Sequence, residues 1–238
     1  MTENKYNYPA TDASIENTAI VMPVYNSEKH LISLISQLFE HFPANQIIAV
    51  DDGSSDNSAQ ICRNQGITLV AFEQNRGKGA ALLAGMKNAW QAGYKFVITI
   101  DSDEQHKPCH LPEFITRQQQ TKAAMVIGKR DFNPRIMPLS RIWSNKLTSF
   151  MVSITVRQKV ADSQCGYRLY YLEPVMNMNL VSPRYQFETE ILLKMARAKY
   201  LIADTDIDTV YGNETSHINH LRDIKNFINI LVSHWLSG

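Results

Sequence analysis

The sequence lacks long apolar runs, paired cysteines and a strong net charge. No apolar run approaches the roughly 20 residues that a membrane-spanning helix needs. The three cysteines are odd in number and are not spaced as metal ligands, so they indicate reduced thiols and no disulfide framework. With a formal net charge of +1, the protein has no strong overall positive potential that would attract nucleic acid. We therefore expect a cytoplasmic protein that meets a membrane, if at all, only peripherally, on the inner face of the cytoplasmic membrane.

The first 110 residues alternate apolar runs with amphipathic segments. The runs predict strands at residues 18–24, 46–50, 67–72 and 95–100, and the segments between them predict helices at 28–42, 58–65 and 80–92. This alternation is typical of an α/β protein whose mostly parallel sheet carries helices on both faces. Because ligands bind such sheets beyond the carboxyl ends of the strands, the polar residues at 25–27, 51–53 and 101–103 should converge on one site.

The second half of the chain is less regular. Its pattern predicts, in order, a strand at 124–128, a helix at 139–156, a loop at 162–168, a short strand at 169–171, a helix at 187–198, an extended segment at 201–211 and an amphipathic helix at 222–236.

An Asp-x-Asp pair, Asp101 and Asp103, follows the buried run at 96–100. Two carboxylates spaced i, i+2 at a strand end project to the same side of a sheet. There they can hold one Mg²⁺ or Mn²⁺, and the open positions of such an ion are commonly filled by substrate phosphates. In isolation such a pair is more often a solvated loop, and only the other motifs favour the metal site.

Other motifs each allow a structural and a functional interpretation. Asp51 and Asp52 form either a turn or carboxylates that bind a base and a ribose. Lys78 follows a glycine that opens a helix, where it is as easily a phosphate contact as a solvated lysine; the surrounding segment fits neither the dinucleotide fingerprint nor the P-loop. Glu188 begins a helix, which alone explains an acid there. A lone loop histidine such as His217 is more often neither ligand nor base.

Taken together, these residues resemble a family 2 glycosyltransferase of the GT-A fold. The form of two motifs, Asp-x-Asp-x-Gln-His at 101–106 and Ser-Gln-Cys-Gly-Tyr-Arg at 163–168, is closest to the dolichyl- or polyprenyl-phosphate sugar synthase branch. The matching segments are residues 21–28, 50–56, 75–85, 101–106, 128–130, 162–170 and 187–193.

The resemblance implies a role for each matched residue. Pro23, Tyr25 and Asp52, with Glu28 and Asp51, would line the base and ribose of a nucleoside diphosphate sugar. Asp101 and Asp103, with Gln105, would hold Mg²⁺ or Mn²⁺ against the diphosphate. Arg130 would approach the phosphates, and Gln164 and Arg168 would face the acceptor. Two departures from the family pattern are Ser27, where the branch often has Glu, and the absence of the membrane-spanning segments that many relatives append.

The implied fold is a GT-A type, Rossmann-like sheet in a single domain of two abutting halves. We expect a flexible lead at residues 1–17, a nucleotide-sugar-binding half at 18–110, an acceptor-binding half at 111–212 and a C-terminal amphipathic tail at 213–238. The segments at 137–147 and 221–235 could touch a membrane, although core packing explains either apolar stripe slightly better.

The implied activity is an inverting, metal-dependent transfer of a sugar from a nucleoside diphosphate donor to a polyprenyl or other lipid phosphate. A lipid phosphate is already anionic near neutral pH and needs no general base. The alternative is a hydroxyl acceptor in cell-envelope polysaccharide or lipid glycosylation, with Glu188 as the first candidate for the base and Asp131 as the second. A non-catalytic sugar-nucleotide-binding module is a further alternative. A nucleotidyltransferase is disfavoured, because residues 23–26 replace its glycine-rich loop.

Overall fold

The computed structural model describes residues 5–132, 137, 139–182, 184 and 186–208 of the chain. The predictions for His217, for the tail at 213–238, for the helix at 222–236 and for the end of the extended segment at 201–211 lie outside the described residues.

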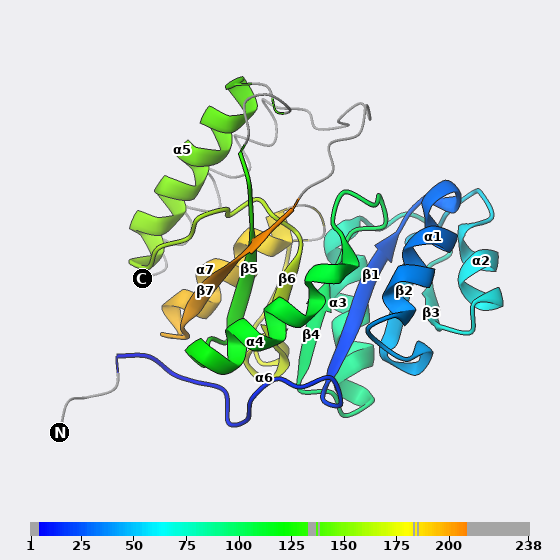
Figure 1. Cartoon of the computed structure of the whole chain (residues 1–238), viewed down its shortest axis with the longest axis horizontal. Helices are drawn as coiled ribbons and strands as arrows, with labels where there is room; N and C mark the ends of the chain where they lie inside the picture. The colour runs from blue at the N-terminus through cyan, green and yellow to red at the C-terminus, as the bar shows by residue number, and fades with distance from the viewer. Residues whose placement is uncertain (1–4, 133–136, 138, 183, 185, 209–238) are drawn as a thin grey trace.

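Seven strands of the described residues form one mixed sheet in the order β3-β2-β1-β4-β6-β5-β7 (Figure 1). Strand β6 runs antiparallel to its neighbours β4 and β5, and every other pairing is parallel. This arrangement confirms the predicted α/β fold with a mostly parallel sheet. The strands are β1 Thr18–Val24, β2 Ile47–Asp51, β3 Thr68–Ala71, β4 Phe96–Thr99, β5 Met125–Arg130, β6 Arg168–Tyr171 and β7 Ile202–Ile207.

Helices cover both faces of the sheet. One face carries α1 (Glu28–Phe39), α2 (Ser58–Asn64) and α4 (Leu111–Thr121), and the other carries α3 (Lys78–Gln91), α6 (Leu172–Met176) and α7 (Gln186–Arg197) (Figure 1). Helix α5 (Leu139–Val156), whose bounds match the prediction, packs beside α7. Short 3₁₀ turns at Ala44–Gln46 and Pro108–His110 precede β2 and α4.

Two helices, α4 and α6, are absent from the sequence prediction. Helix α4 has a proline in its first turn and polar residues along most of its length, so its apolar face is short. Part of that face is Gln118, which is fully buried because its side-chain oxygen accepts a hydrogen bond from Ala13 N at 2.7 Å. Because glutamine is polar, a buried glutamine on the inner face of α4 interrupts the apolar periodicity from which a helix is predicted.

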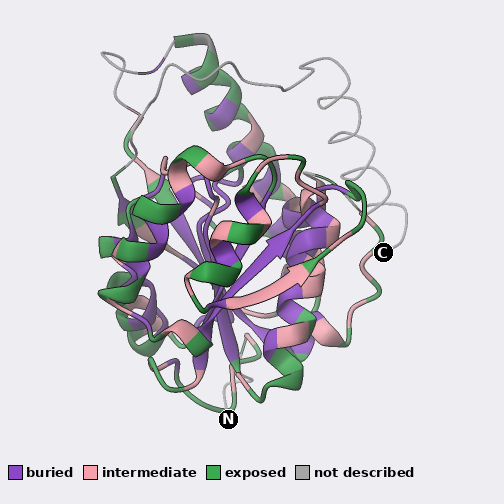
Figure 2. Ribbon diagram, turned by 90° about the vertical axis from the view of Figure 1, so that its right-hand side faces the viewer, coloured by how far each residue is buried: buried purple, intermediate pink, exposed green. Residues whose placement is uncertain are grey.

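The hydrophobic core follows the strands. Strands β1, β2 and β4 are buried almost throughout, and the helices are buried only where they face the sheet (Figure 2). Valine and isoleucine dominate these strands, as expected of parallel strands covered on both faces. The core thereby holds the carboxyl ends of β1, β2 and β4 in fixed positions.

Part of the predicted N-terminal lead, within residues 5–17, makes polar contacts with the rest of the chain. Asn7 N donates to Lys199 O at 2.7 Å, and Asn7 Nδ2 donates to Ala198 O. Farther along, Lys122 Nζ lies 2.5 Å from Asp12 Oδ2. The sequence lacked a signal for this because the contacts involve polar and backbone groups.

Candidate active site

The sheet topology brings the predicted motifs to one edge. Strands β1, β2, β4, β5 and β7 all run in the same direction, so their carboxyl ends lie at the same edge. Because β6 is antiparallel, the loop that precedes it, which contains Gly166, also reaches this edge. The register pairs Thr99 with Arg168, and Thr99 Oγ1 donates to Gly166 O at 2.7 Å. Residues that follow β4 and residues that precede β6 therefore meet.

Lys78 lies at the centre of the residues brought together. Its Nζ lies 2.7 Å from Asp101 Oδ1 and 3.1 Å from Glu188 Oε1, although the second contact is an ion pair without good hydrogen-bond alignment. Burial alone would lower the pKa of Lys78, but the charges of Asp101 and Glu188 raise it above its usual range. Lys78 is therefore a permanent cation between two carboxylates.

Asp101 is held ionised by its surroundings. Burial would raise the pKa of this carboxyl, but the charge of Lys78, followed by the effects of His106 and Arg130, lowers it. Gly166 lies against the same groups: a methyl group on its Cα would stand 2.8 Å from Glu188 Oε1 and 2.9 Å from Lys78 Nζ. Any larger residue at 166 would therefore require these charged side-chain ends to shift.

Asp103 and Gln105 lie in a turn, which corrects one step of the sequence argument. Strand β4 ends at Thr99, so strand alternation does not place Asp101 and Asp103 on one side. Instead, Asp103 Oδ1 accepts a hydrogen bond from Gln105 N at 3.0 Å. The turn is tied to the β1 side of the site by Ser102 Oγ, which lies 2.8 Å from Ser27 Oγ.

The donor set at this turn fits a divalent cation that arrives with a substrate. In the described part of the chain, no group of three or more His, Cys, Asp or Glu side chains is arranged to hold a metal ion on its own. Asp101, Asp103 and Gln105 nevertheless supply hard oxygen atoms, and Mg²⁺ is usually held by one or two carboxylates together with substrate phosphates. Since Lys78 already contacts Asp101, a cation there would have to share or replace that contact.

The acidic residues after β2 hold loops in place. Asp52 is buried, and its two oxygen atoms accept hydrogen bonds from Arg76 N at 2.7 Å and Gly77 N at 2.9 Å. Gly53, with φ of 73°, packs so closely on this loop that an added Cβ would stand 2.6 Å from Gln74 C. Asp52 thus fixes the loop that presents Lys78.

The remaining nucleoside candidates lie on the same side of the site. Glu28 Oε2 accepts hydrogen bonds from Asn57 N and Asn57 Nδ2, both at 3.0 Å. Asp51 is buried and accepts only long bonds from Ser54 N, at 3.4 Å. Tyr25 is 51% exposed, and Pro23 is half-buried. Of these residues, Tyr25 offers the most surface to a ligand.

Arg130, at the end of β5, and Asp162 form a bidentate ion pair. Arg130 Nε lies 2.6 Å from Asp162 Oδ2, and Nη2 lies 2.9 Å from Oδ1. Asp162 is completely buried and also accepts a hydrogen bond from Gln164 N. Asp162 was not among the predicted site residues, although its place at the head of the 162–168 loop was a signal.

Arg168 does not face the acceptor as predicted. It is fully buried, and its nitrogen atoms donate to the backbone carbonyls of Cys165, Glu188 and Ser163 at 2.6, 2.8 and 2.7 Å. Arg168 therefore positions the loop and the start of α7. Gln164, by contrast, is exposed beside α5, where its Nε2 lies 3.4 Å from Thr148 Oγ1.

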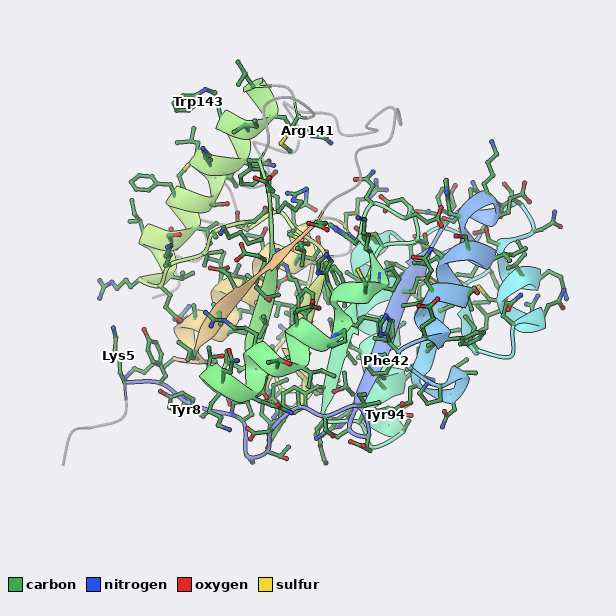
Figure 3. The ribbon with its side chains drawn as sticks, viewed as in Figure 1. Lys5, Tyr8, Phe42, Tyr94, Arg141 and Trp143 are labelled. Carbon is green, nitrogen blue, oxygen red and sulfur yellow. The ribbon has the colours of Figure 1, made fainter. Side chains whose placement is uncertain are left out.

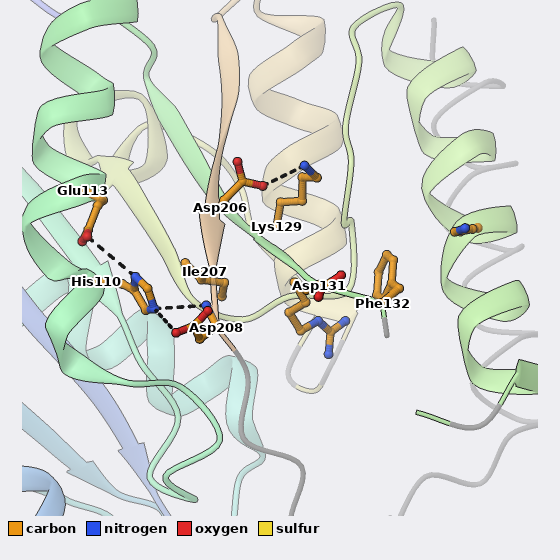
Figure 4. Close-up of a pocket in the computed structure, with 10 residues that line it drawn as sticks. His110, Glu113, Lys129, Asp131, Phe132, Asp206, Ile207 and Asp208 are labelled. Atoms are coloured by element: carbon orange, nitrogen blue, oxygen red, sulfur yellow. Dashed lines mark hydrogen bonds and ion pairs between the residues drawn. The ribbon is translucent and has the colours of Figure 1, made fainter. Parts of the chain in front are cut away.

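A polar pocket of about 550 Å³ lies between β5, β7, α4 and α5 (Figure 4). Its lining includes Arg130, Asp131, Phe132 and Lys146. Lys129 Nζ contacts Asp206 Oδ1 at 2.7 Å across one wall. Asp131, the second candidate base, is an exposed residue of this lining.

His106 is a buried neighbour of the site that the sequence analysis did not assign. Burial lowers its pKa to about 4, and the nearby charges of Asp101 and Arg130 act in opposite directions. Its Nε2 lies 4.0 Å from Cys165 Sγ. His106 is therefore neutral near pH 7 and packs beneath the acidic turn.

Comparison with known proteins agrees with this geometry. The pattern of glycosyl transferase family 2 matches residues 19–176. A UDP-N-acetylglucosamine–dolichyl-phosphate N-acetylglucosaminyltransferase from Methanococcus voltae is 30% identical over 214 residues, which cover 81% of this chain and 85% of the relative. A dolichyl-phosphate beta-glucosyltransferase from Trichomonas vaginalis is 25% identical over 214 residues, which cover 80% of this chain and 64% of the relative.

Solved structures share the fold. The glucosyl-3-phosphoglycerate synthase of Mycobacterium tuberculosis in complex with UDP has a TM-score of 0.70 at 18% identity, covering 95% of this chain and 86% of that one. The same enzyme with Mn²⁺, UDP-glucose and phosphoglyceric acid has a TM-score of 0.68 at 18% identity, covering 92% and 79%. This likeness confirms the GT-A fold. With its family pattern and these relatives, the chain belongs to glycosyl transferase family 2, is an enzyme that uses a nucleotide-sugar donor, and resembles the dolichyl- and polyprenyl-phosphate sugar synthase branch of that family.

Proposed function

We propose that the protein transfers one sugar, with inversion, from a nucleoside diphosphate to a polyprenyl or other lipid phosphate, with the help of a divalent cation. The observation that carries this proposal is the meeting of Lys78, Asp101 and Glu188 at the strand ends. The names of two relatives, both dolichyl-phosphate glycosyltransferases, support a lipid-phosphate acceptor. We also propose that the protein works at the inner face of the cytoplasmic membrane. Among the described residues, no helix is both long and apolar enough to cross a bilayer.

On the donor side, we assign the nucleoside to the surface formed by Pro23, Tyr25 and Asp51. Asp52 and Glu28 shape that surface, because their carboxylates accept hydrogen bonds from backbone N–H groups of the neighbouring loops. Lys78 contacts Asp101 at 2.7 Å, and we assign it to the donor phosphates. UDP-sugars are the first donors to test, because UDP appears in the names of a relative and of the structural neighbours.

Asp101 and Asp103, with Gln105, are the residues that would hold Mg²⁺ or Mn²⁺. When bound, such an ion would neutralise the negative charge that develops on the departing diphosphate. This chain adds a positive charge of its own at the same place, because Lys78 is charged at any ordinary pH. Preorganised charge of this kind is commonly the largest catalytic contribution.

In the reaction, an acceptor oxygen forms a bond to the anomeric carbon as the bond from that carbon to the diphosphate oxygen breaks. The products are the glycosylated acceptor and a nucleoside diphosphate. A phosphate acceptor carries its nucleophilic oxygen already ionised, since its second pKa is about 6. No proton then has to be removed, and Glu188 serves to hold Lys78. A hydroxyl acceptor would instead need Glu188, or Asp131 behind it, to take its proton.

On the acceptor side, we assign the phosphate to the pocket that Arg130 lines, with Gln164 at the neighbouring loop. Arg168 acts through its neighbours, because its guanidinium is buried under that loop. We propose the same division of labour for the two halves of the chain, with residues 18–110 binding the donor and residues 111–212 the acceptor.

The test is release of nucleoside diphosphate from a UDP-sugar, with and without Mn²⁺, on addition of a short polyprenyl phosphate. The proposal requires release that depends on both the ion and the lipid phosphate. Release with a hydroxyl acceptor alone, or with no metal, would contradict it.

Glu188→Gln separates the two acceptor classes. Turnover should stay within a few-fold of the wild type if the acceptor is a phosphate, and should fall by about 10²-fold or more if Glu188 is a general base. Glu40→Gln, an exposed glutamate at the end of α1, is the matched control.

A further inference from the structure

Helix α5 has apolar residues on two faces but buries only one of them. Ile142, Val152 and Val156 are buried on the side where α5 packs beside α7 and the following loop. The other face is exposed to between 56% and 72% at Leu139, Trp143, Leu147, Phe150 and Ile154. Core packing therefore explains one stripe of the helix and leaves the other without a partner among the described residues.

The exposed residues form a patch and are not scattered. Thirteen large hydrophobic side chains are exposed in the described part of the chain, and six of them, including Met151, lie on α5. Their spacing of three and four residues places them along one side of an 18-residue helix about 27 Å long. Figure 3 shows Trp143 projecting outward from one end of α5, away from the sheet. Contiguous exposed apolar surface of this kind marks an interaction site.

The charged residues of α5 and of the segments that flank it in the sequence are basic, whereas the neighbouring pocket that contains Arg130 also has acidic lining residues. Residues 132–161 contain no aspartate or glutamate, and among the described residues they carry four exposed cations, Arg141, Lys146, Arg157 and Lys159. Three of these, Lys146, Arg157 and Lys159, line a groove of about 530 Å³ together with Phe150 and Ile154, and no lining residue is acidic. Lys146 also lines the polar pocket that contains Arg130. The apolar face and the acceptor side of the site are therefore contiguous.

We propose that the outer face of α5 lies on an anionic lipid surface, with its apolar stripe at the acyl boundary and its cations among the headgroups. An amphipathic helix with basic residues beside a stripe of tryptophan, phenylalanine and leucine binds bilayers in this way. The inference rests on the proposed lipid-phosphate acceptor, because a membrane docked on α5 would deliver that acceptor beside Lys146.

Charge decides between the lipid surface and the chain's own tail. Residues 221–235 also carry an apolar stripe, Leu221, Ile224, Ile228, Leu231 and Trp235. That segment has Arg222 and Lys225 against the single acid Asp223, so it does not complement a basic face. An anionic bilayer does.

The experiment is flotation of the full chain with phosphatidylcholine vesicles, with and without about a third of phosphatidylglycerol, in the absence of donor and acceptor. We expect binding to the anionic vesicles that weakens with salt. Trp143→Ser with Phe150→Ser should lower the partition coefficient at least tenfold. Replacing Lys146, Arg157 and Lys159 by glutamine should lower it by about fivefold per charge on anionic vesicles only. Ile32→Ser with Phe39→Ser, two exposed residues of α1, is the control and should change nothing.

A second measurement locates the contact. In a chain that keeps Trp143 but carries Trp90→Phe and Trp235→Phe, brominated lipids should quench the fluorescence. Unquenched Trp143, or unchanged flotation of the α5 double variant, would overturn the proposal. If the tail covers this face, the double variant would instead melt at a lower temperature with vesicle binding unaltered. If a second copy covers it, the wild type would show a concentration-dependent dimer that the variant loses. Either result would also overturn it.

The outcome is separable from that of the proposed function. Vesicle binding is measured without chemistry, so a protein that binds through α5 but glycosylates only water-soluble acceptors would refute the lipid-phosphate acceptor alone. Turnover of the Trp143→Ser with Phe150→Ser variant with a short, detergent-dispersed lipid phosphate should equal that of the wild type.

Discussion

Lys78 lies between the carboxylates of Asp101 and Glu188. Among the described residues, it is the only cation within ion-pair distance of either, so its removal should have a measurable effect. In Lys78→Met, Asp101 and Glu188 would lose their shared counter-ion in a mostly buried site. The free energy of unfolding should fall by about 1–3 kcal/mol, and turnover should be lost. Added Mn²⁺ should restore more stability to the variant than it adds to the wild type, because Asp101 is then available to the ion. Thermal unfolding with and without Mn²⁺ measures both effects.

The control for that substitution lies on the same helix. Lys87→Met removes an exposed lysine of α3 and should leave melting, metal response and turnover unchanged. Equal stabilisation of Lys78→Met and wild type by Mn²⁺ would show that Asp101 is not a ligand.

Gly166 allows the ion-pair cluster to form, and its substitution should separate activity from stability. In Gly166→Ala, the new methyl group would stand 2.8 Å from Glu188 Oε1 and 3.1 Å from Asp101 Oδ2, so the side-chain ends must shift. Displacements of about 1 Å in a catalytic site can cost about 10²-fold in rate. We expect a loss of that order in kcat with little change in melting temperature. Gly66→Ala, at φ of 70° with open space around it, should do the opposite.

At the scale of elements, the loop before β6 depends on Arg168. Its three hydrogen bonds to backbone carbonyls join the loop to the first turn of α7. In Arg168→Met these buried carbonyls would lose their donors, at about 1–3 kcal/mol for each unsatisfied group. Urea denaturation should show a loss of several kcal/mol, whereas Arg63→Met on the exposed side of α2 should show none. A stable Arg168→Met protein would indicate that the loop is held mainly by the Arg130–Asp162 pair.

At the scale of the whole molecule, the sequence predicted the elements better than the contacts between them. Parallel strands have predictable ends, so the convergence of Tyr25, Asp52 and Asp101 followed from the apolar runs. The contact of Lys78 with Glu188 did not follow, because it depends on how α3 packs beside α7. The burial of Arg168 and the exposure of Trp143 could not be predicted from the sequence either. Periodicity shows whether a helix or strand face is apolar or polar, but it does not show what packs against that face.

The stability of the molecule should fall on mild acidification because of His106. Burial lowers its folded pKa to about 4 against an unfolded value near 6.5. The unfolded chain therefore binds a proton more readily, and stability decreases as the pH falls from about 7 to 4. The difference in pKa corresponds to roughly 3 kcal/mol once the pH reaches the folded value. Asp101, whose pKa is lowered, adds a loss of the same sign as the pH falls through its folded pKa.

His106→Phe isolates this effect. The ring is buried beside Tyr167, at 5.4 Å between centroids, and the charges that surround it are Asp101, Arg130, Lys78 and Asp162. Phenylalanine keeps the ring packing but cannot take up a proton, so the free energy of unfolding of the variant should vary less between pH 7 and 4. Urea denaturation at several pH values gives the two curves. If they run parallel, the acid sensitivity arises from the carboxylates instead, and His106 is charged or exposed in the folded protein.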